Sequence, residues 1–180
     1  KVKTGRKGTS MYQVHVHGLA SHAGLEPEKG VNATTEIAHV VLKVSQLENR
    51  EHGTTVVPTV LRSGTTTNTV PHHAILDIDI RSFAMSELER VDATIKALKA
   101  ENPKIRIEVT GGINRPPLQE QSTSALYERA EKVASSIGMS PLGSAKVGGA
   151  SDGNFAAAAG APVLDGLGAV GGGAHAPSEW

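Results

Sequence analysis

The sequence predicts an α+β fold, with a β-α-β-β-α-β domain followed by an α/β segment. Strand-like and helix-like hydrophobic patterns alternate in that order over the first 112 of the 180 residues. This order is typical of the ferredoxin-like, or split βαβ, arrangement, in which two helices cover one face of a four-stranded antiparallel sheet. After the glycine pair at 111–112 the composition changes to few charges and many glycines, which indicates a second unit.

The first half of the domain is predicted from hydrophobic spacing. Residues 11–18 alternate between apolar and polar side chains, as in a half-buried strand, and residues 31–47 carry apolar side chains at helical spacing. Residues 54–62 are rich in β-branched side chains, and residues 68–81 alternate again after a Ser-Gly turn signal. These last two segments are therefore expected to form an antiparallel hairpin.

The second half of the domain adds a helix and a strand. Ser86 and Glu89 have the spacing of a capping box, which predicts a helix that begins there and ends before Pro103. Alternation at residues 105–109 predicts the last strand of the sheet. Together these elements place a first domain at residues 9–111.

Residues 113–180 are interpreted as the end of a second domain whose earlier part lies outside this sequence. A helix is expected over residues 124–137, because apolar side chains recur at helical spacing and Gly138 is a favourable residue after a helix. From Gly138 onward 11 of 43 residues are glycine and few are charged. Such a stretch indicates buried strands joined by tight turns, with one strand at residues 163–164.

The composition excludes several classes of protein. Lys and Arg together number 18, as do Asp and Glu, whereas binding to nucleic acid or to an anionic membrane requires a surplus of positive charge. No window approaches the roughly 18 consecutive apolar residues of a membrane-spanning helix. The absence of cysteine excludes disulfides, thiolate metal sites and cysteine nucleophiles. The first eight residues contain neither an initiator Met nor an apolar signal core. We therefore expect a piece of a longer, cytoplasmic protein, with a secreted or periplasmic location left open.

Three loop residues are candidates for binding or catalysis, and each has a simpler alternative. His22 lies among small residues, where it can donate a proton or hydrogen bond, or be an ordinary solvated histidine. Asn68 can bind a substrate carbonyl, or cap a turn before a proline. Arg115 precedes two prolines, where it can hold a carboxylate with two hydrogen bonds, or lie on the surface. Asp79 and Arg81 can equally form an ion pair on a solvated sheet face.

Further candidates are rich in glycine or histidine. Residues 148–153 lead into a short alanine-rich helix whose backbone amides can bind an anion, or Ser151 can simply be its N-cap residue. His175 follows a run of glycines, which suits a metal site, but zinc needs three or four ligands. His15 and His17, two apart on the first strand, can chelate a metal, although no third ligand is visible nearby.

Taken together, these segments resemble the zinc-dependent metallopeptidase and amidohydrolase family of glutamate carboxypeptidase, acetylornithine deacetylase, succinyl-diaminopimelate desuccinylase and aminoacylase. The matching motifs occur in the same order over almost the whole chain, and those toward the C-terminus are most similar to the glutamate carboxypeptidase branch. They are Ser21-His22-Ala23-Gly24 with Pro27, Gly30-Val31-Asn32-Ala33, Asn68-Thr69-Val70-Pro71, Asp79-Ile80-Arg81, Arg115-Pro116-Pro117, Gly148-Gly149-Ala150-Ser151-Asp152 and Gly172-Gly173-Ala174-His175.

The resemblance implies an architecture and a reaction. In such enzymes a lid, or dimerisation, domain is inserted into a larger catalytic domain, so residues 9–111 would be the lid and residues 113–180 the return into the catalytic domain. The family's site holds two zinc ions, and a metal-bound water attacks an amide carbonyl with a Glu as general base. Most of the metal ligands lie upstream of the lid in the family, and only His175 falls on a metal-ligand position here. The resemblance therefore implies a hydrolase as the full-length protein, and an isolated chain that is inactive and does not hold the two zinc ions.

The resemblance also implies roles for individual residues. His22 matches a lid histidine that reaches a catalytic site, in dimeric members that of the partner protomer, and stabilises the oxyanion. Asn68 matches a lid residue that contacts substrate, and Arg115 matches the arginine that binds the substrate's terminal carboxylate. Gly149 and Ser151 would line the same pocket. The expected substrates are small peptides or N-acyl amino acids with a free carboxylate, and the expected partner is a second copy bound through the lid. The alternative is a dimerisation and ligand-binding module without chemistry of its own.

Overall fold

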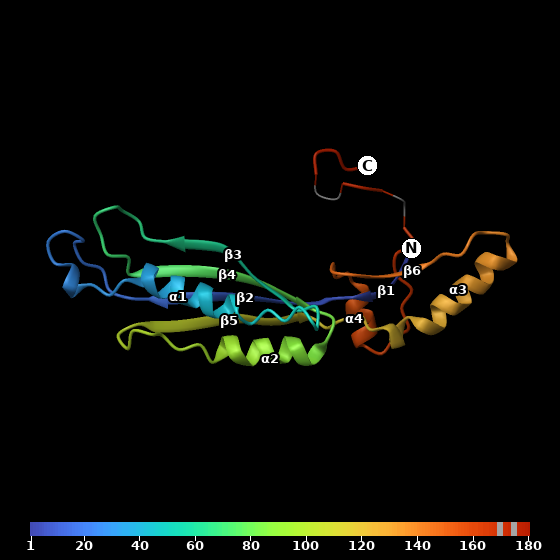
Figure 1. Ribbon diagram of the computed structural model, residues 1–180, viewed down its shortest axis with the longest axis horizontal. Helices are drawn as coiled ribbons and strands as arrows, with labels where there is room; N and C mark the ends of the chain where they lie inside the picture. The colour runs from blue at the N-terminus through green and yellow to red at the C-terminus, as the bar shows by residue number, and fades with distance from the viewer. Residues whose placement is uncertain (169–170, 174–175) are drawn as a thin grey trace.

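The computed structural model describes residues 1–168, 171–173 and 176–180. Its main sheet has four antiparallel strands in the order β3-β4-β2-β5, and α1 and α2 run along this sheet (Figure 1). The bounds of these elements are β2 (Gly8–His17), α1 (Ala33–Ser45), β3 (Thr55–Ser63), β4 (His73–Ser82), α2 (Met85–Lys96) and β5 (Arg106–Arg115). The predicted α+β class and the β-α-β-β-α-β order are confirmed.

The rest of the chain forms a smaller unit around a two-stranded parallel sheet. β1 (Val2–Arg6), which precedes the main sheet in sequence, pairs with β6 (Ser144–Val147), which follows it. This unit also contains α3 (Ser124–Ser136) and the short α4 (Gly153–Ala158), and Figure 1 shows it at one end of the main sheet. The main sheet therefore interrupts the smaller unit in sequence, while the domain boundaries at 9–111 and 113–180 stay a prediction.

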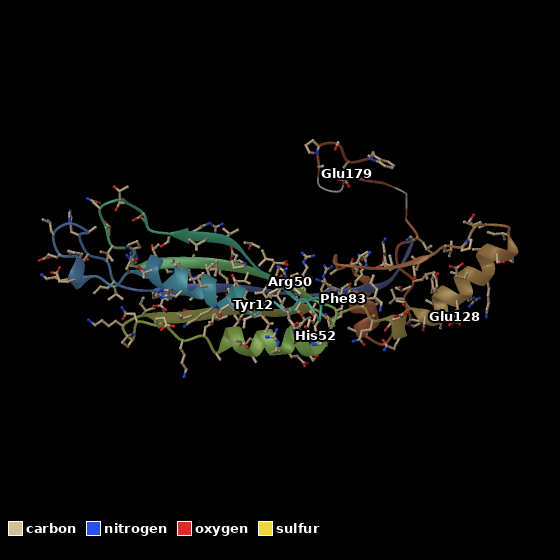
Figure 2. The ribbon with its side chains drawn as sticks, viewed as in Figure 1. Tyr12, Arg50, His52, Phe83, Glu128 and Glu179 are labelled. Atoms are coloured by element: carbon tan, nitrogen blue, oxygen red, sulfur yellow. The ribbon has the colours of Figure 1, made fainter. Side chains whose placement is uncertain are left out.

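The core lies between the main sheet and its two helices. Alternate residues of β2 and β4 and one stripe of each helix are buried, as the hydrophobic spacing predicted. The fully enclosed side chains include Val14, Val16, Ile37, Val40, Val44, Leu76, Ile80, Leu88, Val91 and Ile95. Tyr12, labelled in Figure 2, is also buried, and its hydroxyl donates to Asp92 Oδ1 on α2 at 2.7 Å. A slip of one residue would turn this apolar face to solvent, so burial fixes the register of β2, at whose two ends the candidate site residues gather.

β4 begins at His73 rather than at Asn68, so the predicted strand is too long at its start. Residues 64–72 form a loop instead, and the Asn68 side chain is exposed in it. Pro71 has no N–H to donate to a strand ladder, and the N–H of Val70 donates to the carbonyl of Ser21 rather than to β3. The loop at residues 64–72 is therefore paired with the loop that contains Ser21, and this pairing places Asn68 beside that loop.

α2 begins at Met85 with Ala84 as its N-cap residue, so the predicted capping box of Ser86 and Glu89 is wrong. Both of those side chains are exposed within the helix. The Ser82 hydroxyl instead accepts the N–H of Ala84 at 3.2 Å. The hydrogen bond from Ala84 to Ser82 therefore fixes the turn that precedes the helix, and the Ser86 hydroxyl does not cap it.

Residues 163–164 lie in an irregular segment, so the short strand predicted there is wrong. Val163 is buried, and its N–H donates to the carbonyl of Ser122 at 2.7 Å. This single hydrogen bond satisfies the buried N–H without a strand partner, which explains an apolar segment that is not part of a sheet.

Glu87, in the first turn of α2, gives a test of this packing through its pH dependence. Arg90 donates two hydrogen bonds of 2.9 Å to its carboxylate, and Thr54 donates a third. The hydrogen bonds from Arg90 lower the pKa of Glu87 from 4.5 to about 2. Because the folded pKa is depressed, the ionised carboxylate stabilises the fold above about pH 4.5, and this contribution is lost as the pH falls toward 2.

We therefore expect Glu87→Gln to lower the free energy of unfolding by about 2–3 kcal/mol at pH 7, and by much less near pH 2. Urea denaturation of both proteins at several pH values measures the difference. Parallel pH profiles for the two proteins would contradict the assignment, and Glu89→Gln, an exposed change on the same helix, is the control.

Candidate functional site

Residues 18–32 form the loop that joins β2 to α1 and carries His22. Backbone pairing of Leu19 with Val31 closes the base of this loop. The Asn32 side chain then caps α1 by accepting two backbone N–H groups of its first turn. The loop is thus held at both ends by rigid elements, with His22 between them.

His22 has a defined tautomer because its Nδ1 is a hydrogen-bond acceptor. The backbone N–H groups of Gly24 and Leu25 both donate to this nitrogen at 3.1 Å. A nitrogen that accepts carries no proton, so the proton of neutral His22 lies on Nε2. The side chain is exposed, and its Nε2–H group can therefore donate to a ligand that approaches from outside the loop.

The loop that carries Asn68 is joined directly to the His22 loop. The N–H of Ala23 donates to the Asn68 carbonyl at 2.8 Å, and His22 pairs with Thr69 as an antiparallel bridge. Gly30 permits this approach, because a Cβ there would lie 2.9 Å from Val70 Cγ1 on the Asn68 loop. The structure therefore brings His22 and Asn68 together at one end of the main sheet.

Arg115 lines a cavity of about 220 Å³ at the other end of the main sheet. The cavity is lined by Thr9, Met11, Asp79, Arg81, Asn114, Arg115 and Ala150. The Arg115 guanidinium lies over the ring of Phe155, with 4.9 Å between its carbon and the ring centroid. Its nearest carboxylate is that of Asp152 at 3.6 Å, but the Asp152 side chain is 95% exposed, so this pairing is weak. Arg115 is therefore positioned by an aromatic ring and remains able to bind a carboxylate.

Arg81 lines the same cavity, although the sequence indicated only an ion pair with Asp79 on a solvated sheet face and a family motif. It is opposite Thr9 in the β2–β4 register, and Thr9 is opposite Arg115 in the β2–β5 register, so the three residues form one row across the sheet. Asp79 accepts two hydrogen bonds from Arg81, at 2.8 and 3.2 Å, and these raise the pKa of Arg81. The sequence signals were its place on the polar face of β4, two residues after Asp79, and the motif Asp79-Ile80-Arg81, and neither of them places Arg81 beside Arg115.

Gly149 and Ser151 flank Ala150, which lines this cavity, and their hydrogen bonds are made to other residues of the chain. Arg6 Nη1 donates to the Gly149 carbonyl at 2.8 Å, and the Ser151 hydroxyl donates to Asp165 Oδ2 at 2.6 Å. Arg6 also donates two hydrogen bonds to Asp165, which lower the pKa of that carboxyl. Ser151 thus holds the loop in place, and Asp152 is the N-cap residue of α4, so the alternative that gave this position to Ser151 is wrong.

Arg6 and Asp165 were not among the residues singled out in the sequence. Their ion pair joins β1 to the segment after α4 across 159 residues of sequence. The one available signal was that Asp165 is an isolated charge in an apolar stretch.

The structure does not bring His22 and Arg115 together within one chain. β2 has ten residues, and its two ends are therefore about 30 Å apart. His22 lies five residues beyond His17, the last residue of β2, whereas Arg115 is opposite Thr9 near the first. One protomer alone therefore cannot bring both residues to the same small substrate.

The expected metal ligand, His175, lies outside the described residues. Within the described ranges, no group of three or more His, Asp or Glu residues is arranged to hold a metal ion. Those residues do not fit a two-zinc centre by themselves. Nor is any helix in the same ranges long and apolar enough to cross a membrane.

Comparison with known proteins agrees with the fold. Residues 4–106 match the peptidase dimerisation domain of the M20 peptidases. The chain is 31% identical to carboxypeptidase G2 of a Pseudomonas species, in an alignment covering 97% of this chain and 43% of that protein. Aminopeptidase PepT from Bacillus cereus has a similar structure, with a TM-score of 0.69 and 26% identity, covering 91% of this chain and 44% of that chain. A tripeptidase from Staphylococcus aureus has a TM-score of 0.73 at 22% identity, covering 99% of this chain and 48% of that chain.

Residues 4–106, which contain most of the main sheet and its two helices, therefore form a peptidase dimerisation domain. The chain belongs to the M20 peptidase family, because the family match covers more than half of its residues. It spans less than half the length of the relatives and structures named above.

Proposed function

We propose that the full-length protein is a zinc-dependent hydrolase that cleaves an amide bond next to a free carboxylate. It would act as a carboxypeptidase or an N-acyl-amino-acid amidohydrolase, and this chain supplies the dimerisation and substrate-recognition parts. The observation that carries the proposal is the row of Arg81, Thr9 and Arg115, which brings two guanidinium groups to one cavity. The similarity to carboxypeptidase G2 supports the same class of reaction.

Arg115 is the proposed carboxylate clamp. Phe155 holds the plane of its guanidinium, and its contact with exposed Asp152 is too weak to compete with a substrate. A guanidinium can donate two parallel hydrogen bonds to a carboxylate, which a single point charge cannot reproduce. Arg81 is already bonded to Asp79, so it adds positive charge beside the clamp.

His22 is proposed to act on the reacting carbonyl in the site of a partner protomer. Its Nε2–H can donate to the oxygen on which negative charge develops, and the Asn68 amide on the neighbouring loop can contact the substrate. The separation of about 30 Å between the ends of β2 supports a homodimer, because only a second copy can bring a His22 to the Arg115 cavity.

Zinc would supply an activated water to such a hydrolase. The residues that the structure describes do not fit a two-zinc catalytic centre, so the ligands of the catalytic zinc ions are proposed to come from the rest of the full-length protein together with His175. The lack of a two-zinc centre among the described residues also favours a second candidate function, a dimerisation and ligand-binding module that has no chemistry of its own.

The two candidates are separated by an assay of the full-length protein. We expect hydrolysis of N-acyl-glutamate that is abolished by a chelator, and about 10- to 100-fold lower kcat/KM on the matched substrate whose terminal carboxylate is amidated. The 180-residue chain alone is the control and should show no hydrolysis, because a catalytic zinc needs about three protein ligands. Equal rates on the free and amidated substrates would contradict the clamp, and a full-length protein without hydrolase activity would favour the non-catalytic module.

A further inference from the structure

Three imidazoles gather on the face of the main sheet that points away from the helices. His15 and His17 are two apart on β2, and His73, the first residue of β4, is opposite His17 in the antiparallel register. The ring centroids are 5.0 Å apart for His17 and His73, 5.6 Å for His15 and His73, and 6.2 Å for His15 and His17. The sequence showed a possible chelating pair without a third ligand, and the fold provides that third histidine.

Two of these imidazoles already have the spacing that a metal ion requires. His15 Nδ1 and His73 Nε2 face each other at 3.4 Å. Two imidazole nitrogens bound to the same tetrahedral zinc ion, each at about 2.0–2.1 Å, are also about 3.4 Å apart. The contact is a hydrogen bond, so the ring that donates it has to move that proton to its other nitrogen, and both rings have to turn until their lone pairs meet at the metal ion.

The tautomer of His15 is set by a chain of hydrogen bonds that leaves Nδ1 unprotonated, which is the form of the nitrogen that binds a metal. Gln13 Nε2 donates to Asp77 Oδ1 at 2.8 Å, which fixes the Gln13 amide because a carboxylate oxygen only accepts. Gln13 Oε1 then faces His15 Nε2 at 2.7 Å and accepts its proton. The lone pair of His15 consequently lies on Nδ1. Histidines that bind metals usually donate their other N–H to such a fixed acceptor.

His17 is the candidate third ligand. Its Nε2 is buried and has no hydrogen-bond partner, and Glu108 Oε2 is 3.6 Å away. Burial and the neighbouring Arg106 lower the pKa of His17, which keeps the ring neutral at pH 7. The described residues contain no three donors that already converge on one point, so the His17 ring has to turn about its side-chain bonds. The side chain is 34% exposed, which permits this rotation.

We propose that His15, His17 and His73 bind one divalent transition-metal ion such as Zn²⁺, with water completing its coordination. The inference goes beyond the proposed function and rests only on residues of the lid. His17 is the last residue of β2 and His73 is the first of β4. A bound ion therefore ties together the two strand ends from which the His22 and Asn68 loops emerge.

The proposal is tested by calorimetric titration of Zn²⁺ into the metal-free 180-residue chain at pH 7.5. We expect one ion per chain, and weaker binding at pH 6 because protons compete for the imidazoles. His17→Ala and His73→Ala should abolish this binding, whereas His72→Ala, which removes the exposed neighbouring histidine, should retain it. Gln13→Ala should weaken binding about 10- to 100-fold by freeing the His15 tautomer.

Circular dichroism of each metal-free variant checks that it is folded. If His73→Ala or His17→Ala does not fold, Gln13→Ala decides, because its side chain is not a ligand. The proposal is overturned if the wild-type chain takes up no Zn²⁺, or if Gln13→Ala binds with unchanged affinity. It is also overturned if the folded histidine variants bind normally, or if His175→Ala removes the binding instead.

Discussion

Replacing Arg115 with Ala in the full-length protein is expected to raise KM about 10- to 100-fold with little change in kcat. The guanidinium is proposed to hold the substrate's terminal carboxylate, which takes no part in bond breaking. The contact is therefore equally strong in the ground state and in the transition state, and its loss appears in KM. A charge-assisted contact of this kind contributes about 1.5–3 kcal/mol, which gives the expected range. Steady-state kinetics on N-acyl-glutamate measure it.

Two further variants separate carboxylate binding from a general effect of charge. Arg115→Lys should recover only part of the affinity, because an ammonium cannot make the two-pronged contact or stack on Phe155 in the same way. Arg50→Ala, which removes an exposed arginine of a turn outside the cavity, should leave both constants unchanged (Figure 2). A fall in kcat with KM unchanged in Arg115→Ala would show that the residue acts on the reaction rather than on binding.

The fold was predictable wherever one face of an element is buried. Burial of alternate residues on β2 and β4, and of one stripe on α1 and α2, leaves a clear period in the sequence. The errors lie where backbone hydrogen bonds, rather than burial, decide the structure. The start of β4 depends on a loop pairing between Val70 and Ser21, and the start of α2 depends on Ser82. Neither contact leaves a periodic signal.

The positions of the candidate site residues were predictable in part, for a related reason, while their roles stay a prediction. His22, Asn68 and Arg115 lie in local motifs that can be recognised without knowing the fold. Arg81 becomes a cavity residue only through the registers of three strands, and Arg6 meets Asp165 across 159 residues of sequence. The position of His73 beside His15 follows in the same way from strand pairing. Long-range pairing of this kind has no counterpart in the local sequence.

Replacing His22 is expected to lower kcat about 100- to 1,000-fold, which is the usual cost of losing one oxyanion donor. The substitution has to separate this loss from damage to the loop, since Nδ1 accepts the N–H groups of Gly24 and Leu25. His22→Asn does so, because an asparagine carbonyl can accept backbone N–H groups two and three residues ahead but places no donor where Nε2–H was. His22→Ala and His22→Asn should therefore lose similar amounts of kcat, with His39→Ala, an exposed change on α1, as the control. Unchanged kcat in His22→Asn would return His22 to a purely structural role in the loop.

The same residue tests whether the site is shared between two protomers. Consider a hybrid dimer of one His22→Ala protomer and one His175→Ala protomer. The site of the His22→Ala protomer has its own intact His175 and receives an intact His22 from the partner, so it should work. The site of the His175→Ala protomer lacks both residues. Random mixing makes about half of the dimers hybrids, each with one working site, so about a quarter of the wild-type rate should return. Each variant alone should keep no more than about 1% of the wild-type rate, and sedimentation should show dimers throughout. No recovery, after subunit exchange has been verified by differently tagged chains, would mean that His22 acts within its own protomer. The lid would then have to bend by far more than the rigid β2 allows, because about 30 Å separates the two ends of that strand.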